Sequence, residues 1–134
     1  MTPFSLKIVT PDGLQFDGQA EELIVRTTHG DVAILARHIN YVAPLGMGRA
    51  VVVSEGKRRY AACIGGIVSV VNGEVKLVPT TFEWAENIDA ARAEASRARA
   101  EAVLNKKDAS DTEVKLAQAK LHRALVRKNV ASFK

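Results

Sequence analysis

Short apolar stretches with alternating polar positions run through the first 84 residues. Near the start, the apolar side chains of Phe4, Leu6 and Ile8 alternate with polar neighbours, as in a half-buried strand. Similar runs follow at intervals of about ten residues, with no helical periodicity between them: LQF, ELIVRT, VAIL, RAVVVSEGKRRYAAC and GGIVSVVNGEVKLVP. This pattern predicts an all-β antiparallel sandwich or barrel.

Glycine and proline mark the turns of this first half. Asn72-Gly73 lies between two valine-rich runs and predicts a tight hairpin, because both central residues of such a turn favour positive φ. All nine glycines lie at or before Gly73, and all four prolines lie at or before Pro79. Beyond them alanine dominates, so turn-forming composition stops where helix-forming composition begins.

The second half follows the helical period. Asn87 is the predicted N-cap of a first helix, whose small apolar residues recur at spacings of three and four: Ile88, Ala91, Ala95, Ala98 and Ala102. The stretch NKKDAS ends this helix, and Ser110 with Glu113 predicts a capping box that begins a second one. The expected apolar face of that helix comprises Val114, Ala117, Leu121, Ala124 and Leu125.

These two patterns predict two domains. Residues 1–86 are expected to form the β-sandwich, and residues 87–134 a two-helix hairpin. Because alanine-sized contacts bury little area, the two helices are expected to hold each other weakly, so that the hairpin can open.

Charge is distributed unevenly between the halves. The net charge of +4 comes entirely from residues 85–134, since residues 1–84 carry eight basic and eight acidic side chains. From Val114 to Lys134 there are six basic residues and no acidic one. Such a segment favours an acidic protein surface, a phosphate-bearing ligand or nucleic acid, although it is also compatible with a solvated helix face.

Several kinds of chemistry are excluded by composition and motif. A single cysteine, Cys63, cannot form an intrachain disulfide, and the histidines lack metal-ligand spacing. No phosphate-binding loop of the GxxxxGK[ST] type occurs, so we expect no catalytic residue, no metal and no required cofactor. No secretory signal and no apolar run of the roughly 20 residues that span a membrane is present, so no membrane insertion is expected.

Four stretches occur in the order and spacing of one known family: IVTPDG near the start, HINYVAPLGMG at residues 38–48, IGGIVSVVNGEVKLV at residues 64–78 and IDAARA at residues 88–93. Along its whole length the chain resembles the epsilon subunit of bacterial F-type ATP synthase. The resemblance implies a non-catalytic rotor subunit on the cytoplasmic face of the bacterial cell membrane. Its β-sandwich would link the central-stalk gamma subunit and the membrane ring during proton-driven ATP synthesis.

The resemblance also implies a role for the hairpin. When extended, it would reach the alpha and beta subunits of the catalytic head through its basic second helix and inhibit ATP hydrolysis. The implied rotor contact lies around His29, Gly30, Asp31 and His38. In the preceding loop this chain departs from the family pattern GELGILPGH, because Ala33, Ala36 and Arg37 replace two glycines and a proline.

The stretch IDAARA further implies a site for ATP, as a regulatory ligand, on the folded hairpin. The residues that the resemblance assigns to it are Glu83, Ile88, Asp89, Arg92, Ala93, Arg99, Arg123 and Arg127. Helical geometry independently places Asp89, Arg92 and Arg99 within one quadrant of the first helix. Antiparallel folding would then let four guanidinium groups surround a triphosphate, with Asp89 contacting the base or ribose or orienting Arg92.

Ordinary alternatives remain at this point. The charges of the first helix are also those of a solvated face that binds nothing. A nucleic-acid-binding adaptor is a second hypothesis, although the first half is neutral and poor in aromatic residues for stacking. A third is an enzyme with acid–base groups at His29, Asp31 and His38, for which no nucleophile or metal-ligand set is evident.

Overall fold

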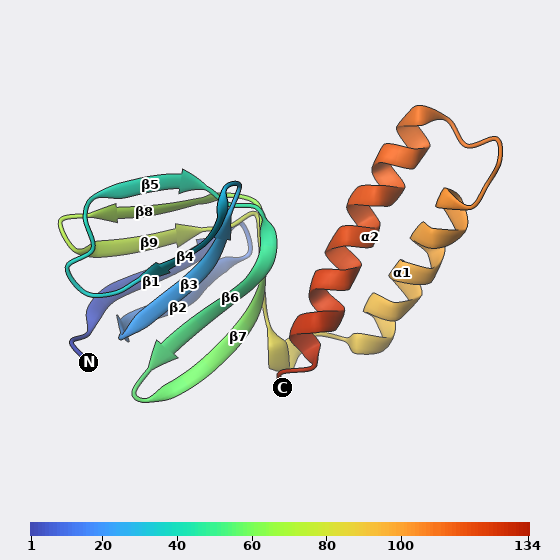
Figure 1. The fold of residues 1–134 in the computed structure, drawn as a ribbon. Helices are drawn as coiled ribbons and strands as arrows, with labels where there is room; N and C mark the ends of the chain where they lie inside the picture. Colours follow the sequence, from blue (N-terminus) through green and yellow to red (C-terminus); the bar gives the residue numbers. More distant parts are fainter. The chain divides into compact units, whose positions relative to one another are not determined.

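A computed structural model describes all 134 residues, which form two compact units, Met1–Trp84 and Ala85–Lys134. The first unit is a sandwich of two five-stranded sheets, and the second is a pair of antiparallel helices (Figure 1). The predicted fold class, a β-sandwich followed by a helical hairpin, is confirmed.

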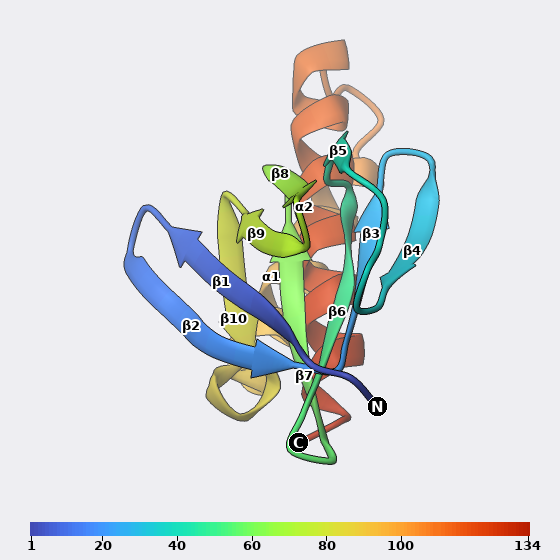
Figure 2. The same ribbon diagram turned by 90° about the vertical axis from the view of Figure 1, so that its left-hand side faces the viewer.

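The first sheet has the strand order β2-β1-β9-β8-β5. Its strands are β1 (Phe4–Thr10), β2 (Gly13–Ala20), β5 (Tyr41–Pro44), β8 (Ile67–Val71) and β9 (Glu74–Val78). Neighbouring strands are antiparallel except β1 and β9, which run parallel with Leu6 opposite Val75 (Figure 2). The sheet therefore differs from the expected antiparallel arrangement. β1 and β9 are distant in sequence and are not joined by a hairpin turn, so they can pair in parallel.

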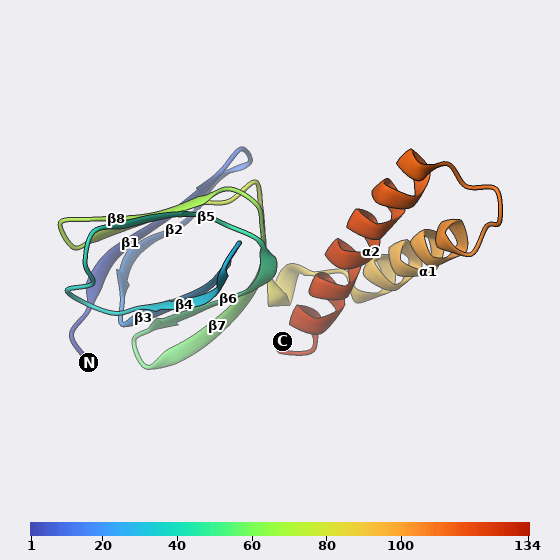
Figure 3. The same cartoon turned by 45° about the horizontal axis from the view of Figure 1, so that its top comes forward.

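The second sheet has the strand order β10-β7-β6-β3-β4 and is wholly antiparallel. Its strands are β3 (Glu22–Thr27), β4 (Gly30–Ile34), β6 (Met47–Ser54), β7 (Lys57–Ile64) and β10 (Thr81–Trp84). The two sheets form two layers, with β1, β2, β5 and β8 in one and β3, β4, β6 and β7 in the other (Figure 3).

The core of the sandwich lies between these layers. The alternation seen in the sequence supplies it, since Phe4, Leu6 and Ile8 of β1 are buried while Ser5 and Lys7 between them are exposed. Cys63 is buried in the same cluster, and burial raises the pKa of its thiol to about 12.

The turn at Asn72-Gly73 joins β8 to β9 as the sequence predicts. Asn72 has a φ of 51° and Gly73 a φ of 82°, so both central residues lie in the left-handed region. The strand pairing then runs from Val71 opposite Glu74 to Ile67 opposite Val78.

The second unit begins with a short 3-10 turn, η1 (Ala85–Asn87), followed by helices α1 (Ala90–Leu104) and α2 (Asp111–Ala131). The predicted N-cap at Asn87 is wrong by two residues. Because η1 ends the preceding segment, the Asp89 side chain takes the capping position and accepts a hydrogen bond from the backbone N–H of Arg92 at 3.0 Å. The predicted capping box of Ser110 and Glu113 is confirmed at the start of α2.

The apolar stripe predicted for α1 is also wrong, in its phase. Ala93 and Ala100 are the buried alanines of α1, whereas the four predicted ones are exposed: Ala91, Ala95, Ala98 and Ala102. Because alanine occurs on every side of this helix, spacings of three and four fit more than one face. On α2, Ala117 and Ala124 are buried as expected, while Leu125 is exposed.

Neither helix combines the length and the apolar character needed to cross a membrane.

Candidate functional site: a cationic groove in the helical hairpin

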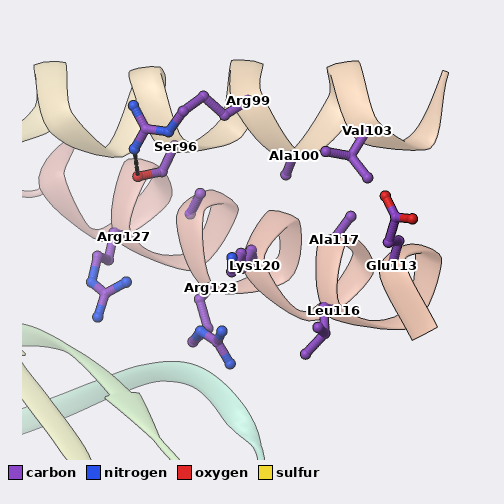
Figure 4. A pocket seen from close by; sticks show the side chains of 11 residues that line it. Ser96, Arg99, Ala100, Val103, Glu113, Leu116, Ala117, Lys120, Arg123 and Arg127 are labelled. Carbon is purple, nitrogen blue, oxygen red and sulfur yellow. Dashed lines mark hydrogen bonds between the residues drawn. The ribbon is translucent and has the colours of Figure 1, made fainter. Parts of the chain in front are cut away.

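A groove with a volume of about 550 Å³ runs along the helical hairpin (Figure 4). Its lining residues come from both helices: Ser96, Arg99, Ala100, Val103, Glu113, Leu116, Ala117, Lys120, Arg123, Ala124 and Arg127. One part of the lining is cationic and the other is made of small and aliphatic side chains. The groove therefore offers both charge for an anion and apolar surface for a less polar group.

The register of the two helices decides which cations share the groove. Lys128 Nζ lies 2.8 Å from Glu94 Oε2, so these two positions face each other across the hairpin. In an antiparallel pair, counting five residues further along α1 and five residues back along α2 from this contact brings Arg99 and Arg123 to the same level along the hairpin. Three of the predicted arginines, Arg99, Arg123 and Arg127, consequently line a single groove.

The cations of the groove are only partly neutralised. Arg99 Nη2 donates to Ser96 Oγ at 3.1 Å, a contact that leaves its charge uncompensated (Figure 4). Arg123 and Lys120 form no hydrogen bond or ion pair within the chain. Glu113 is the one acidic lining residue, and it takes part in the capping box at the loop end of α2. The groove thus has the charge of an anion-binding site.

Four of the residues assigned from the IDAARA stretch lie outside this lining. Ile88 and Ala93 are buried, with exposed fractions of 2% and 4%. The Ile88 carbonyl accepts a hydrogen bond from Lys134 Nζ at 2.7 Å. Asp89 caps α1 through the backbone of Arg92, so the carboxylate contacts the Arg92 main chain and not its guanidinium. The side chain of Arg92 is exposed.

Glu83, the remaining predicted residue of the site, belongs to the sandwich unit. It lies on β10, half-buried, opposite Ala62 of β7.

A network of ion pairs joins the two helices beside the groove. Arg97 pairs with Glu94, and its Nη1 lies 2.6 Å from Glu101 Oε2, while Lys128 reaches Glu94 from α2. The hydrogen bonds from Arg97 and Lys128 lower the pKa of Glu94 to about 2. The hydrogen bonds of Arg97 to Glu94 and Glu101 raise the pKa of Arg97. Glu94 therefore stays ionised at any physiological pH.

Three of the residues predicted for the rotor contact, His29, Gly30 and Asp31, lie at the turn between β3 and β4. Gly30 has a φ of 117°, and its carbonyl accepts a hydrogen bond from Thr27 Oγ1 at 2.8 Å. Thr27 Oγ1 in turn accepts from the backbone N–H of His29 at 3.1 Å. These contacts hold the turn between β3 and β4 in one conformation and leave the His29 side chain exposed.

Asp31 is held by Arg26 of the neighbouring strand. Arg26 Nε donates to Asp31 Oδ1 at 2.6 Å, and the hydrogen bond lowers the pKa of the Asp31 carboxyl while raising that of Arg26. Gly48 leaves room for this arginine, because a Cβ at Gly48 would lie 2.6 Å from Arg26 Cβ.

His38 lies beyond the other end of β4. Its Nδ1 is 2.8 Å from the Ile39 carbonyl oxygen, and its ring packs edge-on against Tyr41 with centroids 5.7 Å apart. The preceding Arg37 has a φ of 65°, a left-handed conformation that the glycine of the family pattern adopts without strain.

The two histidines and Asp31 therefore do not form one cluster. Five-residue β4 separates the turn at His29 from His38, a span of about 13 Å at the usual rise of a strand. With Asp31 committed to Arg26, the hypothesis of an acid–base site in this loop is not supported.

A second exposed feature of the sandwich was missed by the sequence analysis. Across three strands, Pro44, Ile67 and Val78 pair in one row and all are exposed. Val42 and Val71, which are 59% and 48% exposed, extend the same face. The alternation of the strands was visible in the sequence, but an apolar residue on the outer face looks the same there as one in the core.

Comparison with known proteins identifies the family. The family model described as "ATP synthase, Delta/Epsilon chain, beta-sandwich domain" matches residues 3–85, and "ATP synthase, Delta/Epsilon chain, long alpha-helix domain" matches residues 86–132. The chain belongs to the ATP synthase delta/epsilon chain family. The resemblance inferred from the four sequence motifs is thereby confirmed.

Relatives within the epsilon chains match over the full length. The ATP synthase epsilon chain of Ruminococcus albus is 44% identical over 135 residues and covers 100% of both chains. That of Bacillus velezensis is 40% identical over 131 residues, with 98% of each chain covered. Membership of this family makes the chain a subunit of ATP synthase that is not itself catalytic.

A solved structure shares the epsilon-chain fold at low identity. A chain of the Euglena gracilis mitochondrial ATP synthase complex, described as OSCP/F1/c-ring, superposes with a TM-score of 0.84 at 20% identity. The match covers 100% of this chain and 83% of that one. This likeness supports the fold.

Proposed function

We propose that this chain is a regulatory subunit of the ATP synthase rotor, with the β-sandwich attached to the central stalk and the helical hairpin acting as an ATP-dependent inhibitor. The observation that carries the proposal is the groove that Arg99 of α1 and Arg123 and Arg127 of α2 line together. Guanidinium groups are planar, permanently charged donors that match phosphate oxygens. In a subunit of an ATP synthase, ATP is the phosphate-bearing ligand that we propose for this groove.

The packing of the hairpin suits a part that opens. Its fully buried interior on α1 and on the facing part of α2 consists of alanines: Ala93, Ala100, Ala117 and Ala124. Each buries about one methyl group, worth roughly 0.8 kcal/mol, so these four alanines together supply only a few kcal/mol. ATP that bridges the two helices would favour the closed hairpin, and its loss would favour the extended, inhibitory one.

The base is proposed to lie near the start of α1, by Ile88, Asp89 and Ala93. The phosphates would then extend along α2. Glu83 is retained as a candidate contact to the nucleotide on the strength of the family resemblance alone. Because no phosphate-binding loop or carboxylate cluster for Mg²⁺ accompanies the arginines, bound ATP is a regulatory signal and not a substrate.

The sandwich is proposed to supply the attachment to the rotor. The exposed turn at His29, Gly30 and Asp31 and the region of His38 would contact the membrane ring and the gamma subunit. The apolar row of Pro44, Ile67 and Val78 adds surface of the kind that interfaces cover. The basic second helix would meet acidic surfaces of the alpha and beta subunits. With these contacts, the chain would be held on the cytoplasmic face of the bacterial membrane.

Reconstitution with the catalytic head tests both halves of the proposal. ATP hydrolysis would be compared with the full chain, with residues 1–86 and with no added chain, at low and high ATP. The truncated chain keeps the complete sandwich core. We expect inhibition by the full chain at low ATP, relief at high ATP and no inhibition by residues 1–86. Equal rates with the full and truncated chains would refute the inhibitory role.

Point variants separate the nucleotide site from the rest. Arg123→Ala removes a groove cation that has no partner in the chain, whereas Lys115→Ala removes an equal charge from α2 outside the groove. We expect Arg123→Ala to abolish the rise in hairpin stability on adding ATP and Lys115→Ala to retain it. Arg92→Ala tests whether a residue of the sequence motif that lies outside the lining contributes to binding.

A further inference from the structure

Lys120 lines the cationic groove, but it is not one of the residues that the family resemblance assigned to the ATP site. It lines the groove together with Arg123 and Arg127, and the three follow one another along α2 (Figure 4). Their spacing of three and then four residues places them within about 60° of each other around the helix. The groove thus contains a row of three cations on one helix face.

The three cations of this row differ in role from Lys128, the lysine of α2 that forms an ion pair with α1. Lys128 is engaged with Glu94 of α1, whereas Lys120 forms no hydrogen bond or ion pair and is exposed. Its ammonium group is therefore available to a ligand without the loss of an internal contact. Lysine binds phosphate as a point charge with three donors.

The register gives the row a direction. Because Glu94 faces Lys128, Arg127 lies toward the start of α1 and Lys120 toward the loop between the helices. Seven residues separate Arg127 from Lys120, which corresponds to about 10 Å along the helix axis. Beyond Lys120 the next charged lining residue is Glu113, two turns further on, which would repel an anion. Lys120 is consequently the last cation that a phosphate chain would meet.

From this arrangement we infer that Lys120 contacts the terminal phosphate and makes the groove selective for ATP over ADP. The inference rests on the nucleotide site proposed above, in which the base lies near the start of α1. A diphosphate would reach Arg127 and Arg123 but end short of Lys120. A triphosphate would engage all three cations together with Arg99.

The test is the affinity of the full chain for ATP and for ADP, measured by titration calorimetry at constant ionic strength. Lys120→Gln removes the charge and keeps a similar helix propensity. We expect it to weaken ATP binding about tenfold, as for loss of one charge-assisted hydrogen bond, and ADP binding less than about threefold. The preference for ATP over ADP should fall accordingly.

Two matched variants make the result specific. Lys115→Gln removes the same charge from the same helix outside the groove, and it should leave both affinities within about twofold. Arg123→Gln lies nearer the base end and should weaken ATP and ADP alike.

If Lys120→Gln weakens the affinity for ATP and ADP equally, or weakens neither, the proposed role of Lys120 is refuted. The ATP site itself is then still supported, provided that the wild-type chain binds ATP. Absence of nucleotide binding by the wild-type chain overturns the site and this inference together.

Discussion

Gly66, between β7 and β8, is the position where a single methyl group should damage the sandwich most directly. It has a φ of 96°, and a Cβ built there would lie 2.1 Å from the Val78 carbonyl oxygen and 2.6 Å from Pro79 Cα. Both are backbone atoms, which cannot move aside as a flexible side chain does. The Gly66 carbonyl also accepts a hydrogen bond from the Leu45 N–H at 2.9 Å, which displacement of the turn would break.

Gly73, in the turn at the other end of β8, provides a matched control. It has a φ of 82°, but a Cβ there meets nothing within 4 Å. Alanine at Gly73 should therefore cost only the left-handed conformation, about 1 kcal/mol after the gain from a less flexible unfolded chain. Alanine at Gly66 adds a collision of overpacking size and a lost hydrogen bond, for a total of about 3–5 kcal/mol.

Thermal unfolding followed by tryptophan fluorescence measures the difference. Trp84 is the single tryptophan, and it is buried in the sandwich core, so its emission reports on that unit. At the usual 4–8 °C per kcal/mol for a domain of this size, Gly73→Ala should lower Tm by about 5 °C and Gly66→Ala by about 20 °C. Equal shifts for the two variants would refute the reasoning, since they would show that the close backbone contact carries no cost.

Three further outcomes follow from the structure. Arg37→Gly should raise the Tm of the sandwich by a few degrees because it relieves a φ of 65°, and an unchanged or lower Tm would contradict this. The ion pairing of Glu94, whose pKa is lowered to about 2, stabilises the hairpin above pH 4.5 and should be lost between pH 4.5 and 2. Hydrogen exchange in α2 should show this acid sensitivity, and Lys128→Gln should reduce it; an unaltered profile would exclude the pair. Cys63 should resist alkylation in the folded chain, since its thiol is buried with a pKa of about 12, and should react once the sandwich unfolds.

Local rules account for most of what the sequence predicted correctly. The alternation in β1, the Asn72-Gly73 turn and the capping box at Ser110 depend on neighbours a few residues apart, so the chain specifies them wherever they lie in the fold. The parallel pairing of β1 with β9 joins segments about 70 residues apart, and no local pattern encodes it.

The candidate site divides in the same way. The arginines of the groove, Arg99, Arg123 and Arg127, were named from the sequence because residue type and family motif identify them. The role of Asp89 as N-cap was not predicted from the sequence, because η1 shifts the start of the helix by two residues. In an alanine-rich helix the sequence leaves the buried face undetermined as well, and Ala93 and Ala100 became interior only when α2 packed against them.

By itself, the sequence determined a strand-rich half, a helical half, the family and an excess of positive charge on the second helix. These properties are set by composition, by period and by residues close together in the chain. The tertiary structure alone decided which charges act together. The pairing of Glu94 with Lys128 sets the register of the hairpin. That register brings Arg99 and Arg123 to the same level and leaves Lys120 as the cation of the groove nearest the loop between the helices. Contacts between helices depend on this register, which residues on one helix cannot specify.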